Sequence, residues 1–157
     1  MGIYGLVFAV FFAVVLAYAA QTEENHSIDM TEARQRASAS ALLVVHQAAV
    51  VYARSNPAVT GNIALPALNI ANGFANVEIA TNISNTGAVR TWVIPTAKSE
   101  NQIVLAEATR LHQGSLNIGV TLATGGWRSM LGVNTIGGAS DTVNVPVGVV
   151  MVFSQVR

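Results

Sequence analysis

An apolar run without a charged side chain stands at the start of the sequence and limits what the chain can become. Residues 3–20 read IYGLVFAVFFAVVLAYAA, with Tyr4 and Tyr18 near the two ends. A helix of this length spans about 27 Å, close to the roughly 30 Å hydrocarbon core of a bilayer. Its backbone hydrogen bonds are satisfied internally, and tyrosine rings favour the membrane interface. We therefore predict a membrane helix that contacts lipid through residues 3–20, with residues 1–20 as an anchor.

The same run also fits a secretory signal peptide. The tripeptide Ala17-Tyr18-Ala19 has the small-x-small pattern that precedes a signal-peptidase cut. No basic residue precedes the run, however, and the run is longer than the usual apolar region of a signal peptide. We expect the segment to be retained, so that one small domain lies outside the cytoplasm. The alternative, a released domain, stays open.

The charge content of the chain excludes several classes of function. Only 10% of the residues are charged, against about 25% in ordinary soluble domains, and eight basic residues balance eight acidic ones. Lys98 is the only lysine and no basic cluster exists, so nucleic acid is not an expected partner. The absence of cysteine excludes disulfides, thiolate metal sites and cysteine nucleophiles.

A polar stretch and a long helical pattern together occupy residues 21–56. From about residue 28 to residue 54, small and apolar side chains recur three and four positions apart: Ala33, Ala37, Ala41, Val44, Ala48 and Val51. That spacing is typical of one face of an α-helix, and Asn56-Pro57 is a helix stop signal. We predict a long amphipathic helix whose alanines allow close approach by another helix or a sheet. Ala37 and Ala41 are possible partner contacts.

Residues 57–157 are predicted to form a small sheet domain packed on that helix. The expected elements are a loop at 57–76, strands at 77–83, 88–94, 115–123 and 141–153, and a helix at 99–111. Alternating apolar positions define the strands, and Asn85-Thr86-Gly87 provides a hairpin turn. Pro146 cannot donate to a ladder, so the last strand should be an edge strand or carry a bulge. The expected fold class is α+β: a membrane helix, a long amphipathic helix, and a small antiparallel β-sheet with a second short helix.

No residue pattern predicts catalysis, cofactor binding or a metal site, so an enzyme is not expected. The three histidines are far apart in the sequence: His26, His46 and His112. A lone histidine within a helix, such as His46, is usually structural or exposed. The glycine-rich residues 125–138 lack the Gly-Lys-Ser/Thr ending of a phosphate loop, and we interpret them as a loop between strands. Glu107 and Arg110 are spaced for a surface ion pair on one helix.

The two tryptophans have different expected roles. Trp92 falls within a predicted strand, where a place in the core is the more common outcome. Trp127 follows a double glycine and precedes Arg128. Exposed aromatic residues often anchor a partner surface, so Trp127 and Arg128 are possible partner contacts.

The order of these segments resembles the type IV pilin architecture, in which an apolar helix and a long helix precede a small sheet domain. A pilin, however, has a basic leader, a glycine before the cut and usually a glutamate five residues after it. Here only Met1 precedes Gly2, and Val7 stands at the position of the glutamate. The sequence therefore disfavours a conventionally processed major pilin.

The chain is more similar to the PilM family of plasmid-type (type IVb) thin-pilus systems. The resemblance lies in the start MGIYGLVFAVFFAVVLAYA, the helix TEARQRASASALLVVHQAAVVYARSNP and the tail VPVGVVMVFSQVR. It implies a structural component of pilus assembly in the bacterial inner membrane, with a periplasmic carboxyl-terminal domain, other pilus-assembly proteins as partners and no catalytic residues. A minor pilin-like fibre subunit and a released periplasmic binding domain remain the alternatives. Self-association into a homo-oligomer also stays open.

Overall fold

The computed structural model describes residues 30, 32–70, 78–94, 100–112, 117–130, 135–137, 139–142 and 144–156. The chain divides into two compact units, Met1–Arg34 and Gln35–Arg157. The predicted membrane helix at residues 3–20 lies outside the described residues. Among the residues that are described, no helix has both the length and the apolar character needed to cross a membrane.

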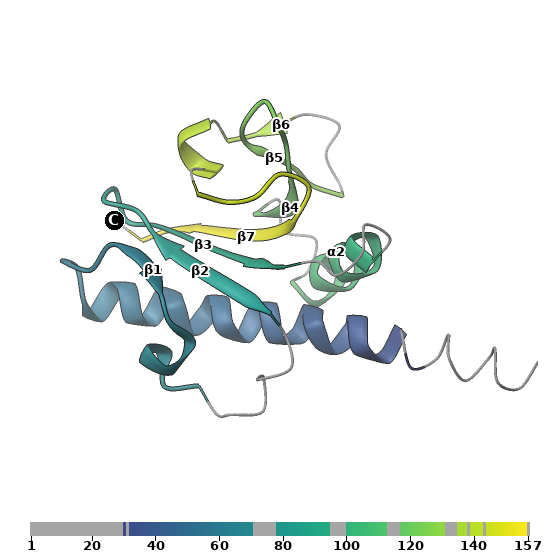
Figure 1. Cartoon of the computed structure of the whole chain (residues 1–157), viewed down its shortest axis with the longest axis horizontal. Helices are drawn as coiled ribbons and strands as arrows, with labels where there is room; N and C mark the ends of the chain where they lie inside the picture. Colours follow the sequence, from purple (N-terminus) through teal and green to yellow (C-terminus); the bar gives the residue numbers. More distant parts are fainter. Residues whose placement is uncertain are drawn as a thin grey trace, which may run out of the picture. The chain divides into compact units, whose positions relative to one another are not determined.

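The described residues form an α+β fold, as the sequence predicts. Seven antiparallel strands make one sheet in the order β1-β2-β3-β7-β4-β5-β6 (Figure 1). The strands are β1 (Gly61–Ile63), β2 (Ile79–Ile83), β3 (Ala88–Val93), β4 (Ile118–Thr121), β5 (Trp127–Arg128), β6 (Thr135–Ile136) and β7 (Val150–Gln155). The helical elements are a long helix over residues 32–55, α2 (Glu100–Leu111), and the 3-10 turns η1 (Leu65–Leu68) and η3 (Ala139–Thr142).

The last strand of the chain lies in the middle of the sheet. β7 pairs antiparallel with β3 on one side and with β4 on the other. Figure 1 shows β7, in yellow, running between them. β7 thus joins β1-β2-β3 and β4-β5-β6 into a single sheet.

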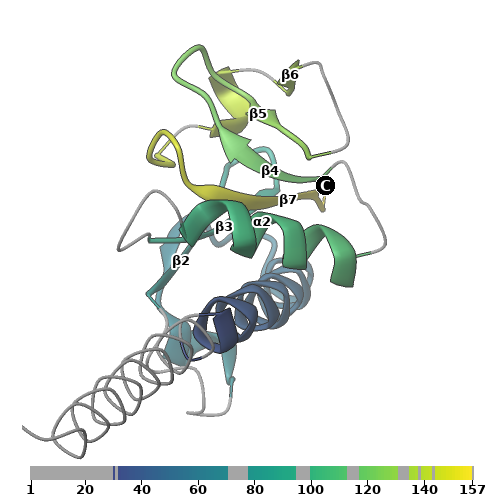
Figure 2. The same ribbon diagram turned by 90° about the vertical axis from the view of Figure 1, so that its right-hand side faces the viewer.

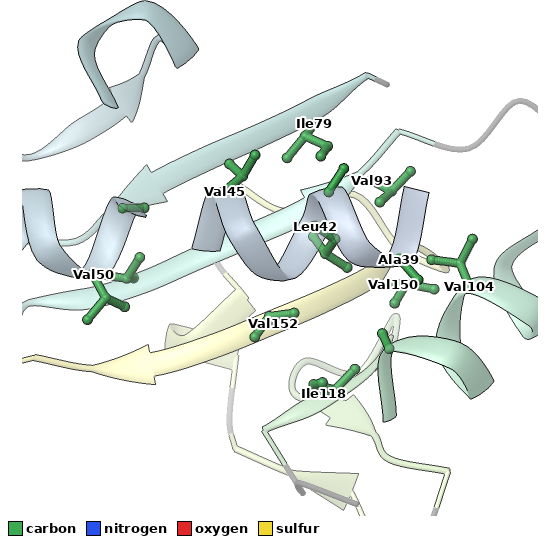
Figure 3. Close-up of a cluster of buried hydrophobic side chains, with 14 of the residues drawn as sticks. Ala39, Leu42, Val45, Val50, Ile79, Val93, Val104, Ile118, Val150 and Val152 are labelled. Carbon is green, nitrogen blue, oxygen red and sulfur yellow. The ribbon is translucent and has the colours of Figure 1, made fainter. Parts of the chain in front are cut away.

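Both helices cover the same face of this sheet, and the main hydrophobic core lies between the two layers (Figure 2). Figure 3 shows side chains from each element meeting there: Ala39, Leu42, Val45 and Val50 of the long helix, Val104 of α2, and Ile79, Val93, Ile118, Val150 and Val152 of the sheet. The strands contribute alternate residues, because successive side chains point to opposite faces of a sheet.

The face of the long helix that meets the sheet differs from the alanine-rich stripe that the sequence pattern emphasises. The fully buried side chains run along a different line: Ala39, Ala41, Leu42, Val45, Ala49 and Ala53. Of the predicted stripe, Ala41 is buried, but Ala37, Val44 and Val51 are exposed. Both lines have helical spacing, so periodicity alone did not distinguish the inner face from the outer one.

The opposite face of the sheet carries a smaller cluster built around the two tryptophans. Trp92, Trp127, Val149 and Met151 are buried in it. The ring of Trp127 stacks on Phe153 with the ring centroids 5.0 Å apart. Trp92 is 5% exposed, which confirms its expected place in the core.

A buried arginine fixes η3 to this second face. Arg90 of β3 is 3% exposed, and its Nε and Nη2 donate to the backbone oxygens of Asp141 and Ser140, each at 2.6 Å. Its Nη1 donates to the side-chain oxygen of Asn82 at 3.2 Å. Burial lowers the pKa of Arg90, while the Asp141 carboxylate opposes that shift. The guanidinium therefore holds η3 through its backbone oxygens.

Several predicted elements are confirmed. β2 and β3 form the expected hairpin, and Gly87 in its turn has a φ of 81°, which glycine adopts without strain. α2 ends at Leu111 as predicted. Within it, Glu107 and Arg110 form the expected ion pair at 2.6 Å.

Three expectations were wrong in detail. Residues 141–153 are not one strand, because their first part forms η3 and turns, and β7 begins only at Val150. Pro146 lies in the turn before β7, where its carbonyl oxygen accepts a hydrogen bond from the Thr121 hydroxyl at 2.6 Å.

The predicted loop at 57–76 contains β1 and η1, and the glycine-rich loop at 125–138 contains β5 and β6. Strands this short carry too few residues for a recognisable alternation.

Candidate partner-binding face

Between Arg36 and Arg54, the side of the long helix that faces away from the sheet is uncharged. Five exposed side chains lie along it three and four positions apart, and we name them the outer ridge: Ala37, Ser40, Val44, Gln47 and Val51. The two valines, Val44 and Val51, are the large apolar members and are 46% and 53% exposed. This spacing is that of the a and d positions of a coiled coil, where one helix packs against another.

The helix also lacks the charges that usually keep an outer face in water. Between Arg36 and Arg54 the sequence contains no Asp, Glu, Lys or Arg. A helix that packs one side on a core normally carries charged residues on the other side. The outer ridge therefore differs from the usual solvent-facing side of a helix.

An apolar groove of about 530 Å³ lies beside the outer ridge, on the side of η1. Its lining residues are Val44, Gln47, Ala48, Val51, Tyr52, Ser55, Asn56, Ala67, Leu68 and Asn69. Pro66 lies in the first turn of η1, and Asn69 ends η1 in the left-handed region with a φ of 52°. This local geometry turns the chain so that Leu68 is buried in the main hydrophobic core.

A second groove, of about 580 Å³, lies on the other side of the ridge, toward α2 and β7. Its lining residues are Leu43, Val44, His46, Gln47, Val50, Arg54, Leu111, His112, Asn117, Ser154 and Gln155. We name it the polar groove, because polar atoms supply most of its exposed surface. Val44 and Gln47 border both grooves, so the outer ridge separates them.

A buried histidine connects the polar groove with the core. His46 is 5% exposed, and its Nε2 lies 2.7 Å from the hydroxyl oxygen of Ser154 on β7. Its Nδ1 lies 3.1 Å from the hydroxyl oxygen of Thr91 on β3. Thr81 on β2 in turn donates to Thr91 at 3.3 Å. These contacts form one series of hydrogen bonds that connects β2, β3 and β7 to the long helix.

Both ring nitrogens of His46 have a hydroxyl partner. In a neutral imidazole one nitrogen donates and the other accepts, so both ends of the ring are satisfied in either tautomer. Burial, with His112 as a smaller cause, lowers the pKa of His46 from 6.5 to about 4. The imidazole is therefore neutral at neutral pH.

The structure separates the four residues that the sequence offered as possible partner contacts. Trp127 and Ala41 are 2% and 0% exposed, so burial in the two cores removes them from the surface. Trp127 is buried because β5 and β6 fold its ring onto Phe153. Ala37 is exposed on the outer ridge, and Arg128 is exposed on β5. Within the described ranges, no three His, Asp or Glu side chains are grouped to hold a metal ion.

The residues that sequence reasoning passed over are Val44 and Val51 as surface residues and Ser154 as the partner of His46. The uncharged stretch between Arg36 and Arg54 was a signal for the first two, since a half-buried helix of that length should carry charges outward. No sequence signal joins His46 to Ser154, because only the sheet register brings β7 beneath the helix.

The amino-acid sequence of the chain matches the model of a known protein family. The model of the PilM family matches residues 9–151, so the chain belongs to that family. Its role is therefore related to pilus assembly. No curated protein and no solved structure matches the chain.

Proposed function

We propose that this chain is a non-enzymatic structural component of type IVb pilus biogenesis that acts through protein–protein contacts. Its partners are other pilus-assembly proteins of the inner membrane and periplasm. It is a single-pass protein of the bacterial inner membrane that contacts lipid through residues 3–20 and holds its carboxyl-terminal domain in the periplasm. Membership of the PilM family and the apolar run at residues 3–20 support this proposal.

The outer ridge is the observation that carries the proposal of protein contacts. Val44 and Val51 keep about half of their surface in water, and the apolar groove runs alongside them. Burying the remaining surface of both valines contributes roughly 2 kcal/mol to a complex, and filling the groove adds to that. An apolar helix of a partner fits this surface, since the ridge has coiled-coil spacing.

The surroundings of His46 support a structural role for the His46–Ser154 pair. A histidine that activates a serine is usually oriented by a third group such as a carboxylate. Here His46 is 5% exposed, and the hydroxyl of Thr91 lies at its Nδ1 where a carboxylate would stand. The pair therefore serves as a connection between the helix and the sheet.

Site-specific photo-crosslinking tests the proposed contact surface. A photoreactive amino acid replaces Val51 in cells that assemble the pilus, and the matched control carries it at Val147, which is 64% exposed in the turn before β7. We expect a crosslink to another pilus-assembly protein from position 51 and none from position 147. Equal crosslinking at both positions, or none at position 51, would contradict the proposal.

A charge substitution gives the functional counterpart of that test. Val51→Glu should abolish or strongly reduce piliation, because binding would then bury an unpaired carboxylate. Val147→Glu should leave piliation unchanged. Both valines are exposed, so circular dichroism of the two variants should match that of the unchanged chain. Normal piliation in Val51→Glu would remove the outer ridge from the proposal.

The absence of cysteine makes the proposed membrane placement easy to test. A single cysteine introduced at Ser55, which is exposed, is treated with a membrane-impermeant maleimide in intact spheroplasts. We expect labelling from the periplasmic side, recovery in the inner-membrane fraction and an intact mass near 16.4 kDa. A mass that lacks the first 19 or 20 residues would indicate a released domain. Recovery in sheared filaments would indicate a pilin-like subunit.

A further inference from the structure

The outer ridge keeps a heptad order along its whole length. Its apolar members, Ala37, Val44 and Val51, stand seven residues apart, and Ser40 and Gln47 each follow three residues after one of them. In a coiled coil the apolar members would occupy the a positions and the other two the d positions. Valine at position a is a feature of parallel two-stranded coiled coils. The ridge therefore has the pattern of one strand of a helix pair.

The rest of the fold leaves this side of the helix accessible. Ala39, Leu42 and Val45 point from the same helix toward the sheet (Figure 3), whereas the ridge lies on the side away from the sheet. A groove borders the ridge on each side, which gives space for the side chains of a second helix. At 1.5 Å per residue the ridge is about 21 Å long, or roughly four helical turns.

The chemistry of the ridge favours an identical helix as the partner. In a symmetric pair each side chain near the axis meets its own copy, so a charge there would meet a like charge. The sequence has no charged residue between Arg36 and Arg54, so a symmetric pair meets no such repulsion along the ridge. Gln47 would meet the second copy's Gln47, and two carboxamides can donate to and accept from each other. A single polar pair in an apolar seam fixes the register of two helices.

We propose that two copies of this chain pair in parallel through the outer ridge. The parallel direction rests on the proposed function, because two chains anchored in one membrane by residues 3–20 enter their long helices from the same side. Anchoring also raises the effective concentration of the second copy, which compensates for the modest contact area of two valines per helix. Tyr52 and Asn69 of the apolar groove lie off the ridge, so another pilus-assembly protein can contact the pair there.

Disulfide crosslinking of the full chain in inner-membrane vesicles tests the pairing. The chain has no cysteine, so each variant carries a single one: Val44→Cys, Val51→Cys or, as the control, Val147→Cys. Facing a positions of a parallel pair bring two cysteines within disulfide reach. Oxidation with copper phenanthroline should therefore give at least about tenfold more disulfide-linked dimer from each ridge position than from position 147, which is 64% exposed in the turn before β7.

A charge substitution tests whether the seam runs through Gln47. Gln47→Glu, combined with Val51→Cys, places two carboxylates against each other and should lower the dimer yield at least about tenfold. Gln102→Glu on α2 adds the same charge at another exposed position and should leave the yield unchanged. Both glutamines are exposed, so the tryptophan fluorescence of the two variants should match that of the unchanged chain.

Three results would overturn the proposal. Dimer from Val44→Cys without dimer from Val51→Cys would indicate an antiparallel pair, in which Val51 lies opposite Ala37. An equal yield from Val147→Cys would indicate random collision in the membrane. If neither ridge position gives a dimer, the ridge does not pair with a second copy.

These outcomes are distinguishable from a failure of the proposed function. A crosslink from position 51 to a different pilus-assembly protein, without a disulfide-linked dimer, would overturn the pairing and leave the proposed function intact. A dimer without any crosslink to a different protein would have the opposite meaning.

Discussion

Acidification should destabilise the folded domain through one buried imidazole. His46 is 5% exposed, and burial together with the nearby His112 lowers its pKa from 6.5 to about 4. In the unfolded chain the imidazole is in water and titrates near its ordinary value. Between these two pKa values the unfolded chain binds a proton that the folded chain does not. The free energy of unfolding therefore decreases as the pH falls through this window.

The size of the effect follows from the two pKa values. The contribution of the neutral imidazole is fully present above pH 6.5 and is lost as the pH falls toward 4. Protonation of His46 should remove about 2 kcal/mol of stability at pH 5 and about 3 kcal/mol at pH 4. Small domains are stable by only about 5–15 kcal/mol, so this loss is large enough to measure.

Urea unfolding at pH 7, 6, 5 and 4 provides the assay. Trp92 and Trp127 are both buried, so their fluorescence reports unfolding. His46→Gln is the comparison variant, because glutamine keeps hydrogen-bonding groups and does not titrate. Carboxylates protonate in both proteins, so the difference between the two pH profiles isolates His46.

The unchanged chain should lose about 3 kcal/mol more than His46→Gln between pH 7 and pH 4. Two profiles that fall in parallel would refute the argument that His46 is buried in its neutral form. A steeper fall in His46→Gln would reverse the sign and refute it more strongly.

Three further substitutions test other parts of the fold by urea or thermal unfolding. Arg90→Met leaves the η3 carbonyls without their donor and should cost about 2–4 kcal/mol, whereas Arg128→Met on the surface should change stability by less than about 0.5 kcal/mol. Gly119→Ala places a methyl group 2.5 Å from the backbone oxygen of Arg128 and should cost about 1–3 kcal/mol. Gly61→Ala has open space and should cost only about 1 kcal/mol, from its φ of 97°. Thr109→Val removes a buried hydroxyl oxygen that lacks a partner in the described structure, and should raise the melting temperature by about 2–5 °C. A lower melting temperature for Thr109→Val would mean that a water molecule satisfies this hydroxyl.

The elements that the sequence predicts well are those whose signals are local. The β2–β3 hairpin has a turn sequence and two alternating strands, and α2 has an ion pair and an apolar stripe. The long helix is predicted by its spacing and its stop signal, and it ends at residue 55, close to the predicted position. Such features depend on neighbours within a few residues, so they are visible without the fold.

The features that the sequence missed depend on contacts between distant segments. Pro146 suggested an edge strand, but the strand starts beyond it at Val150 and lies in the centre of the sheet. Trp127 could be a surface or a core residue until β5 and β6 placed it against Phe153. His46 gave no sign of its partners, because Thr91 and Ser154 are far from it along the chain.

The contacts of His46 also have a mechanical consequence. Alanine and valine side chains give packing between the two layers that has no directional bonds. His46 binds the middle of the long helix to β3 and β7 through two directional hydrogen bonds. A pull along the helix axis must break these bonds before the helix can slip over the sheet. The histidine therefore resists axial movement of the helix, and a pull along the helix axis would load β3 and β7 in shear.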